Sequence, residues 1–166
     1  MKYSSHTPFL LWGGAAFVLG VDQLSKSWVV ENLPEHVPVD VFPWLRSVLS
    51  FTRLTNTGVA FGLFPQFGSF FTVLAAVVIV AILFFYRTLE VEDWLTHLAL
   101  GLQIGGALGN LVDRLFRGSV VDFLDVNFWP FENFPVFNLA DSAIVVGVAL
   151  LLISTWLQDR READGV

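Results

Sequence analysis

Four apolar segments, each long enough to cross a lipid bilayer as a helix, dominate this sequence. A transmembrane helix needs about 20 mostly apolar residues, and the four segments run over approximately residues 8–30, 67–86, 94–116 and 138–157. Of the 166 residues, 55% are hydrophobic and only 14% are charged, which is typical of the membrane class. We therefore expect a single integral membrane domain over residues 1–166, all-α in class, with four transmembrane helices.

The residues near the ends of these segments bear on whether the first segment is cleaved and on how the chain is oriented in the membrane. The first segment follows Lys2 and runs on to Val30 through charged positions, so an uncleaved span is favoured over a secretory signal peptide. Four spans put both termini on one side, and we expect that side to be the cytoplasm. Positive charges prefer cytoplasmic connections, but the bias is too small to decide: Lys2, Arg87, Arg160 and Arg161 stand against Arg46, Arg53 and Arg117.

Two of the connections are expected to have structure of their own. The first covers about residues 31–66. Over residues 36–66, alternating and β-branched residues at 47–55 predict strands, and Asn56-Thr57-Gly58 favours a turn. We expect a small β-cradle there, on the membrane face. The other, residues 117–137, holds aromatic side chains suited to an interfacial loop at headgroup depth: Phe123, Phe128, Trp129, Phe131, Phe134 and Phe137.

Charge and composition exclude several classes of function. The net charge is −6 and the chain has no basic cluster, so no nucleic-acid partner is expected. The absence of cysteine removes thiol nucleophiles, thiolate metal sites and disulfides. The histidines, at positions 6, 36 and 97, do not have metal-ligand spacing. We therefore expect neither a metal nor a cofactor.

Charged and small residues inside the apolar segments point to helix pairing. Asp22 and Lys26 are four residues apart, hence on one helix face, where an ion pair lowers the cost of burying either charge. A structural role is the favoured interpretation of this pair. Gly101, Gly105 and Gly109 recur every four residues, which allows another helix to approach closely. Packing is the favoured interpretation for these glycines.

A polar stripe marks the third segment. Gln103, Gly106 and Asn110 follow one another at helical spacing, continued by either Asp113 or Arg114, and lipid cannot satisfy such groups. The stripe should therefore face the interior of the bundle. Two interpretations stay open for Arg114: it steadies an anion or a neighbouring carboxylate, or its long side chain reaches the membrane interface.

Two aspartates, Asp122 and Asp141, lie on opposite flanks of the aromatic loop. Each has a structural explanation: apolar neighbours suggest that Asp122 sits on a strand or turn pressed into apolar surroundings, and Asn138 with Asp141 is typical of a helix start. Their joint position favours a function, because both fall at one membrane border, on the ends of one loop, and can converge across it.

A converging carboxylate pair predicts hydrolysis. Two carboxylates held close do not both ionise easily, so one keeps a proton while the other stays charged. The charged member can draw a proton from water as the water attacks a peptide carbonyl, and the protonated member can hydrogen-bond the developing oxyanion. This chemistry needs no metal. The titration belongs to the pair, so neither Asp122 nor Asp141 is assigned permanently as acid or base.

Five distinctive blocks of sequence follow one another along nearly the whole chain: Asp22-Gln-Leu-Ser-Lys26, Asn56-Thr-Gly-Val-Ala-Phe-Gly62, Gly105-Gly-Ala-Leu-Gly-Asn-Leu-Val-Asp-Arg114, Val120-Val-Asp-Phe123 and Phe137-Asn-Leu-Ala-Asp-Ser142. Together they resemble the lipoprotein signal peptidase family, also called prolipoprotein signal peptidase or signal peptidase II. The resemblance implies an aspartic endopeptidase of the bacterial inner membrane. Such an enzyme removes signal peptides from diacylglyceryl-modified prolipoproteins and cuts just before the lipidated cysteine.

The resemblance also implies roles for individual residues. Asp122 and Asp141 match the family's catalytic pair. Residues that match substrate-binding or supporting positions are Asn56, Gly58, Gly106, Asn110, Arg114, Asn138 and Ala140, together with Asp22 and Lys26 of the first span. Inhibition by the cyclic peptide globomycin, contact with membrane lipid and an active site near the periplasmic face are further implications. We expect the protein to be a monomer.

Three other classes of membrane protein fit part of the same pattern. An ion-coupled carrier or channel component would use Asp22 and Lys26 as a relay, but the chain has no internal repeat. A serine–lysine peptidase would pair Lys26 with a neighbouring serine, although adjacent helix positions face apart. A presenilin-type protease would need a Gly-x-Gly-Asp block, whereas Asp141 follows Asn138-Leu-Ala.

Overall fold

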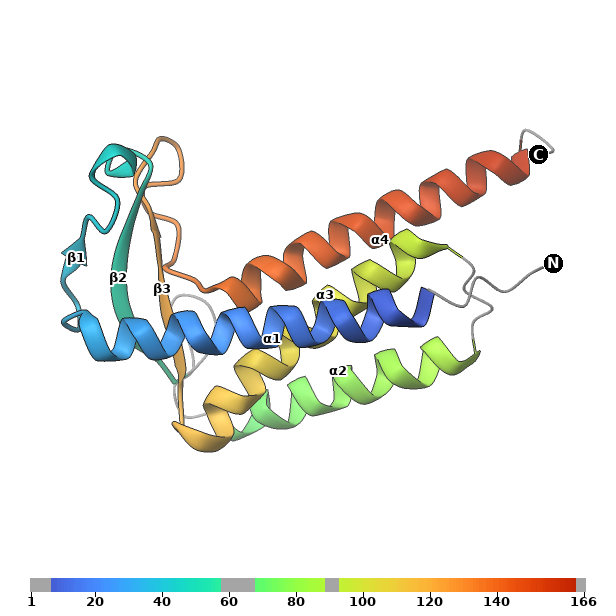
Figure 1. The fold of residues 1–166 in the computed structure, drawn as a ribbon, viewed down its shortest axis with the longest axis horizontal. Coiled ribbons are helices and arrows are strands. Elements are labelled where there is room, and N and C mark those ends of the chain that lie inside the picture. Colours follow the sequence, from blue (N-terminus) through green and yellow to red (C-terminus); the bar gives the residue numbers. More distant parts are fainter. Residues whose placement is uncertain (1–6, 58–67, 89–92, 164–166) are drawn as a thin grey trace.

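The computed structural model describes residues 7–57, 68–88 and 93–163. Within these ranges the helices are α1 (Thr7–Asn32), α2 (Gly68–Thr88), α3 (Trp94–Phe116) and α4 (Leu139–Ala163), and the strands are β1 (Pro38–Val39), β2 (Leu49–Asn56) and β3 (Val120–Val126). A 3-10 turn, Pro43–Leu45, lies between β1 and β2. The sheet caps one end of the helical bundle, and the start of α1 and the end of α4 lie at the other end (Figure 1).

Helices occupy each of the four apolar segments, but their apolar lengths differ. Among the described residues, two helices are long and apolar enough to cross a membrane: α3 and the Leu139–Arg161 part of α4. The apolar part of α2 is shorter, Ser69–Phe84. In α1 the run is interrupted between Asp22 and Ser27, where polar side chains recur. The fold is thus mostly helical, with a small antiparallel sheet and two candidate membrane spans.

The sheet draws strands from two connections. Its order is β1-β2-β3 and both pairings are antiparallel. β2 pairs with β3 from Leu49 opposite Val126 to Asn56 opposite Val120, with an irregularity between Phe51 and Leu54. Strands β1 and β2 lie within the predicted cradle, residues 36–66, and the third strand, β3, comes from the 117–137 connection, where no strand partner was predicted. Residues 58–66 of the predicted cradle lie outside the described residues.

A return of the chain beside β3 sets the start of α4. Phe137 accepts backbone hydrogen bonds from Phe123 and Leu124, 2.9 and 2.7 Å long, and donates one to Leu124 over 3.1 Å. The next residue, Asn138, therefore stands beside the middle of β3, and α4 begins immediately after it. These hydrogen bonds bring the two ends of the aromatic loop together, so Asp122 and Asp141 can approach each other as the sequence predicted.

Glycines let α3 pack closely against α1 and α4. A Cβ added at Gly101 or at Gly105 would lie 2.6 Å from a carbonyl oxygen of α1, and one at Gly109 would lie 2.5 Å from a carboxylate oxygen of Asp22. The packing role predicted for these three glycines is confirmed. On the opposite face, a Cβ at Gly106 would collide with the Ala140 carbonyl oxygen, so Gly106 also serves helix packing.

Candidate active site

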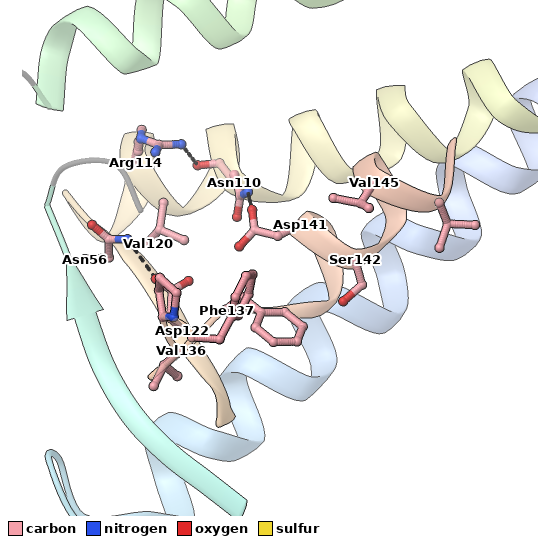
Figure 2. Close-up of a pocket in the computed structure, with 13 residues that line it drawn as sticks. Asn56, Asn110, Arg114, Val120, Asp122, Val136, Phe137, Asp141, Ser142 and Val145 are labelled. Atoms are coloured by element: carbon pink, nitrogen blue, oxygen red, sulfur yellow. Dashed lines mark hydrogen bonds between the residues drawn. The ribbon is translucent and has the colours of Figure 1, made fainter. Parts of the chain in front are cut away.

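A cavity of about 580 Å³ opens between β3, the end of α3 and the first turns of α4 (Figure 2). Its polar side chains come from the strands β2 and β3 and from two helices, and its apolar wall comes from β3, the aromatic loop and α4. The lining residues are Asn56, Asn110, Arg114, Val120, Asp122, Phe134, Pro135, Val136, Phe137, Asp141, Ser142, Val145 and Val146. Both predicted carboxylates are among them.

Asp122 lies on β3 and is almost fully buried, with 4% of its surface exposed. Two side-chain amides hold its oxygens: Asn56 donates to Oδ2 over 2.8 Å and Asn138 donates to Oδ1 over 2.7 Å. Burial is the main influence on its acidity and raises the pKa of Asp122 to about 6, against the opposing hydrogen bonds from the two asparagines. This carboxyl therefore takes up a proton far more readily than an exposed aspartate.

Asp141 lies in the first turn of α4. Its Oδ1 accepts a hydrogen bond of 2.7 Å from the side-chain amide of Asn110, and its Oδ2 accepts one of 3.3 Å from the backbone N–H of Asn138. In return, Oδ1 of Asn138 accepts from the backbone N–H of Asp141 over 2.9 Å. These reciprocal bonds make Asn138 a helix N-cap. Asp141 therefore both takes part in the N-terminal cap of α4 and lines the cavity.

Asn110 and Asn138 connect the two carboxylates. The side-chain amide of Asn138 donates to Oδ1 of Asn110 over 3.2 Å as well as to Asp122. The amide group of Asn110 in turn donates a hydrogen bond to Asp141. Figure 2 shows Asp122 and Asp141 facing the same space, with Asn110 beside Asp141 and Asn56 beside Asp122. A hydrogen-bonded path therefore joins the pair through protein atoms alone.

Lys26 lies fully buried behind Asn110. Its ammonium group contacts Asp22 at 2.9 Å, Asp113 at 3.0 Å and Oδ1 of Asn110 at 2.9 Å. An ammonium has three N–H donors, so these partners satisfy it. The structural ion pair predicted for Asp22 and Lys26 is confirmed, with Asp113 as a further member. This saturation leaves the ion-relay alternative without support.

Either Arg114 or Asp113 could continue the polar stripe of α3, and in the structure their side chains point in different directions. Arg114 is partly buried in the cavity wall, donates to the carbonyl oxygen of Asn110 over 3.4 Å, and interacts electrostatically with Asp141 and Asp122. This placement fits the carboxylate-steadying interpretation of Arg114. Asp113 points away, toward α1, where it meets Lys26.

The remaining predicted residues have mixed placements. Asn56 lies in the cavity wall as expected. Ala140 is fully buried and its backbone N–H donates to Oδ1 of Asp22 over 3.0 Å, so it joins α4 to α1 and does not line the cavity. Gly106 packs against the same alanine. Gly58 lies outside the described residues.

The serines beside Lys26 do not contact its ammonium group. Ser25 donates to the carbonyl oxygen of Asp22 over 2.8 Å, and Ser27 accepts from the guanidinium of Arg117 over 3.0 Å. Lys26 in turn is satisfied by carboxylate and amide oxygens. This geometry does not support a serine–lysine pair.

Gln23 and most of the apolar cavity wall were not predicted from the sequence. Gln23 donates to both Asp22 and Asp113, over 3.2 Å each, and its place beside Asp22 in the first block was the only available hint. The sequence predicted Phe134 as part of the interfacial loop, but nothing distinguished the rest of the apolar cavity wall, Pro135, Val136, Val145 and Val146, because apolar residues occur throughout a membrane-type helix and aromatic loop.

Solved structures with the same architecture define the class of protein. Two of them, described as "Bacterial membrane enzyme structure by the in meso method" at 2.3 and 1.9 Å resolution, superpose with TM-scores of 0.81 and 0.78, each at 32% sequence identity. The first match covers 97% of this chain and 93% of the other, and the second covers 93% and 95%. The fold, together with a cavity lined by buried carboxylates, is that of a membrane enzyme.

The family follows from sequence comparison. Residues 14–157 match the family model described as "Signal peptidase (SPase) II". Two curated relatives named lipoprotein signal peptidase, from Desulfitobacterium hafniense strains DSM 10664 / DCB-2 and Y51, are each 43% identical over 153 residues, which cover 92% of this chain and 97% of the relative. The chain belongs to the signal peptidase II family and is accordingly a peptidase.

Proposed function

We propose that this protein is an aspartic endopeptidase that removes signal peptides from diacylglyceryl-modified prolipoproteins, cutting just before the lipidated cysteine. Asp122 and Asp141 are the catalytic pair, and the reaction is independent of metal ions. Membership of the signal peptidase II family supports the substrate class. One structural observation carries the assignment of the residues: both carboxylates line one cavity, and each accepts a hydrogen bond from a side-chain amide.

The pair supplies one base and one acid. The charged carboxylate accepts a proton from a water molecule while the water oxygen bonds to the scissile carbonyl carbon. The protonated carboxyl donates its proton to the carbonyl oxygen, so a neutral tetrahedral intermediate forms. On collapse, the leaving nitrogen takes a proton from the first carboxyl, the C–N bond breaks, and the hydroxyl proton of the intermediate returns to the second carboxylate. The high pKa of Asp122 supports a shared proton.

The supporting residues orient this pair. Asn56 and Asn138 fix the carboxylate of Asp122, and Asn110 fixes that of Asp141. Arg114 adds a positive charge at the same wall, which stabilises the negative charge that the pair retains. Preorganised amide donors need no rearrangement when charge moves during the reaction, and this lowers the barrier.

The apolar part of the cavity suits a lipidated substrate. Phe134, Val145 and Val146 form a wall that continues from the carboxylates along α4. A signal peptide is an apolar helix and the diacylglyceryl group is a pair of hydrocarbon chains, so both partition into the bilayer and meet this wall sideways. The aromatic loop then closes over the scissile bond and limits water.

The topology we propose is that of a four-span protein of the bacterial inner membrane. α1 and α2 cross the bilayer beside the two candidate spans α3 and α4, both termini are cytoplasmic, and the sheet and cavity lie at the periplasmic face. The sheet lies at the end of the bundle opposite to the start of α1 and the end of α4, as this topology requires (Figure 1). The protein acts as a monomer in contact with lipid and is inhibited by globomycin.

The test is cleavage of a diacylglyceryl-modified prolipoprotein by purified, lipid-reconstituted protein with a metal chelator present throughout. Wild type should cut, and Asp122→Asn and Asp141→Asn should lose turnover while their thermal unfolding shows a folded protein. Cleavage by both variants would overturn the assignment of the pair. Inhibition of wild type by the chelator would overturn metal independence.

A further inference from the structure

Asp113, near the end of α3, is a fully buried carboxylate that the proposed reaction does not use. It does not line the cavity. Its Oδ2 contacts the ammonium of Lys26 at 3.0 Å and also accepts a hydrogen bond of 3.2 Å from the backbone N–H of Val121. Burying a charge is costly unless it is paired and hydrogen-bonded. These two contacts connect Asp113 to Asp141 and to Asp122.

One contact leads to Asp141. Lys26, held by Asp113, donates to Oδ1 of Asn110 over 2.9 Å, and the amide nitrogen of Asn110 donates to Asp141 over 2.7 Å. An amide has one acceptor end and one donor end, so a cation at its oxygen fixes which end faces the carboxylate. The orientation of Asn110, and with it the donor to Asp141, therefore depends on where Lys26 is held.

The other contact leads to Asp122. Val121 is the residue before Asp122 on β3, and its N–H points toward α3 onto Oδ2 of Asp113. Neighbouring side chains on a strand point to opposite faces, so fixing the backbone at Val121 fixes the direction in which Asp122 projects. A single carboxylate oxygen thus anchors the segment that carries each member of the pair.

We infer that Asp113 is a positioning residue for both catalytic carboxylates, through Lys26 and Asn110 to Asp141 and through the Val121 backbone to Asp122. The inference rests on the proposed function, because it concerns the geometry of the same pair. Asp113 touches neither substrate nor the cavity and acts only through these neighbours.

Arg117 completes the charge balance of this arrangement. Its guanidinium pairs with Oδ1 of Asp113 and donates to Gln23 over 3.1 Å, while 30% of its side chain stays exposed. The two negative charges of Asp22 and Asp113 are thereby matched by the two positive charges of Lys26 and Arg117. The catalytic pair, with Arg114 in its own wall, lies beside a cluster of zero net charge.

Two substitutions change this balance in opposite directions. Asp113→Asn leaves the cluster with one net positive charge, which favours ionisation of the neighbouring catalytic pair. Arg117→Gln leaves one net negative charge, which disfavours it. The pH at which the shared proton is lost, seen as the fall of kcat/KM with rising pH, should therefore move down in Asp113→Asn and up in Arg117→Gln. The upward shift should be smaller, because Arg117 is partly exposed and screened.

Kinetics in lipid should separate positioning from a general loss of fold. We expect kcat of Asp113→Asn to fall about 10- to 100-fold with KM little changed, the size expected for misplaced charge-assisted hydrogen bonds. The matched control is Asp93→Asn, at the opposite end of α3, where Asp93 caps the helix through the N–H of Thr96. Asparagine is an equally good N-cap, so this variant should keep the wild-type rate and pH profile.

The outcomes distinguish this inference from the proposed function. If Asp122→Asn and Asp141→Asn are inactive while Asp113→Asn and Arg117→Gln both keep the wild-type pH profile, the inference is overturned and the proposed function stands. Shifts in the same direction for both variants would also overturn it. If Asp113→Asn does not fold, the upward shift of Arg117→Gln decides alone. Cleavage by the two pair variants would instead refute the assignment of Asp122 and Asp141 as the catalytic pair, on which this inference rests.

Discussion

The side-chain amide of Asn138 donates a hydrogen bond of 2.7 Å to the carboxylate of Asp122, while its oxygen caps α4 by accepting from the backbone N–H of Asp141 over 2.9 Å. One asparagine thus holds one carboxylate and starts the helix that carries the other. Only a side chain with both a donor and an acceptor can do this. The separation of the two carboxylates is therefore tied to the orientation of Asn138.

Substitutions of Asn138 should separate its two roles. Serine is a good N-cap but is too short to reach Asp122, and alanine does neither. We expect Asn138→Ala to be about 1 kcal/mol less stable than Asn138→Ser. Both should lose about 10- to 100-fold in cleavage rate, because each lacks a hydrogen bond to a charged group. Thermal unfolding and initial cleavage rates measure the two effects, and wild-type cleavage by Asn138→Ser would contradict the second.

The stability of the protein should depend on pH through Asp122. Burial raises the pKa of this carboxyl from 3.8 to about 6. Between these values the folded protein binds a proton that the unfolded chain has released, so the free energy of unfolding falls as pH rises through this window, by about 3 kcal/mol in all. Asp122→Asn removes this dependence.

The measurement is the free energy of unfolding of wild type minus that of Asp122→Asn, in the same detergent, from about pH 4 to about pH 7. Contributions from titrating groups that do not interact with Asp122 cancel in the difference. We expect the difference to decline as pH rises and to level off above the pKa of Asp122. A flat difference would show that Asp122 is not buried as described.

A pair of glycines should test the close packing of α1 and α3. A Cβ at Gly105 would lie 2.6 Å from the Ala15 carbonyl oxygen and 2.8 Å from Val18, whereas one at Gly20 meets nothing within 4 Å. Gly105→Ala should cost about 1–3 kcal/mol through overpacking. Gly20→Ala should be neutral or stabilising by up to about 1 kcal/mol, because alanine loses less conformational entropy in a helix. Equal unfolding temperatures for the two variants would contradict this packing.

The aromatic loop should contribute to substrate affinity. Phe134 lines the cavity and packs edge-on against Phe131, with ring centroids 6.4 Å apart. Phe131→Ala and Phe134→Ala should raise KM for lipidated substrate about 2- to 12-fold with kcat little changed, which corresponds to the loss of one aromatic contact. Trp94→Ala, at the far end of α3, is a control with a similarly exposed aromatic ring. An unchanged KM in both loop variants would refute the loop's role.

Much of this fold was accessible from local sequence properties. The length of an apolar run predicts a helix that lipid or a neighbouring helix can cover, and each of the four predicted segments is helical in the structure. The spacing of Asp22 and Lys26 likewise predicted their ion pair, because residues four apart share a helix face. The cradle was predicted incompletely, since pairing of β3 with β2 joins residues about 70 positions apart, and no local pattern encodes that register.

By itself, the sequence determined that Asp122 and Asp141 flank one loop between apolar segments, and that polar residues near them must turn away from lipid. Only the tertiary structure decided which oxygen meets which amide, and that Arg114 faces the cavity while Asp113 faces Lys26. The reason is geometric: consecutive residues on a helix point about 100° apart, and Asn110 is three residues from one and four from the other. Periodicity allows either to continue the stripe, and the choice depends on the helices and strand that pack around them.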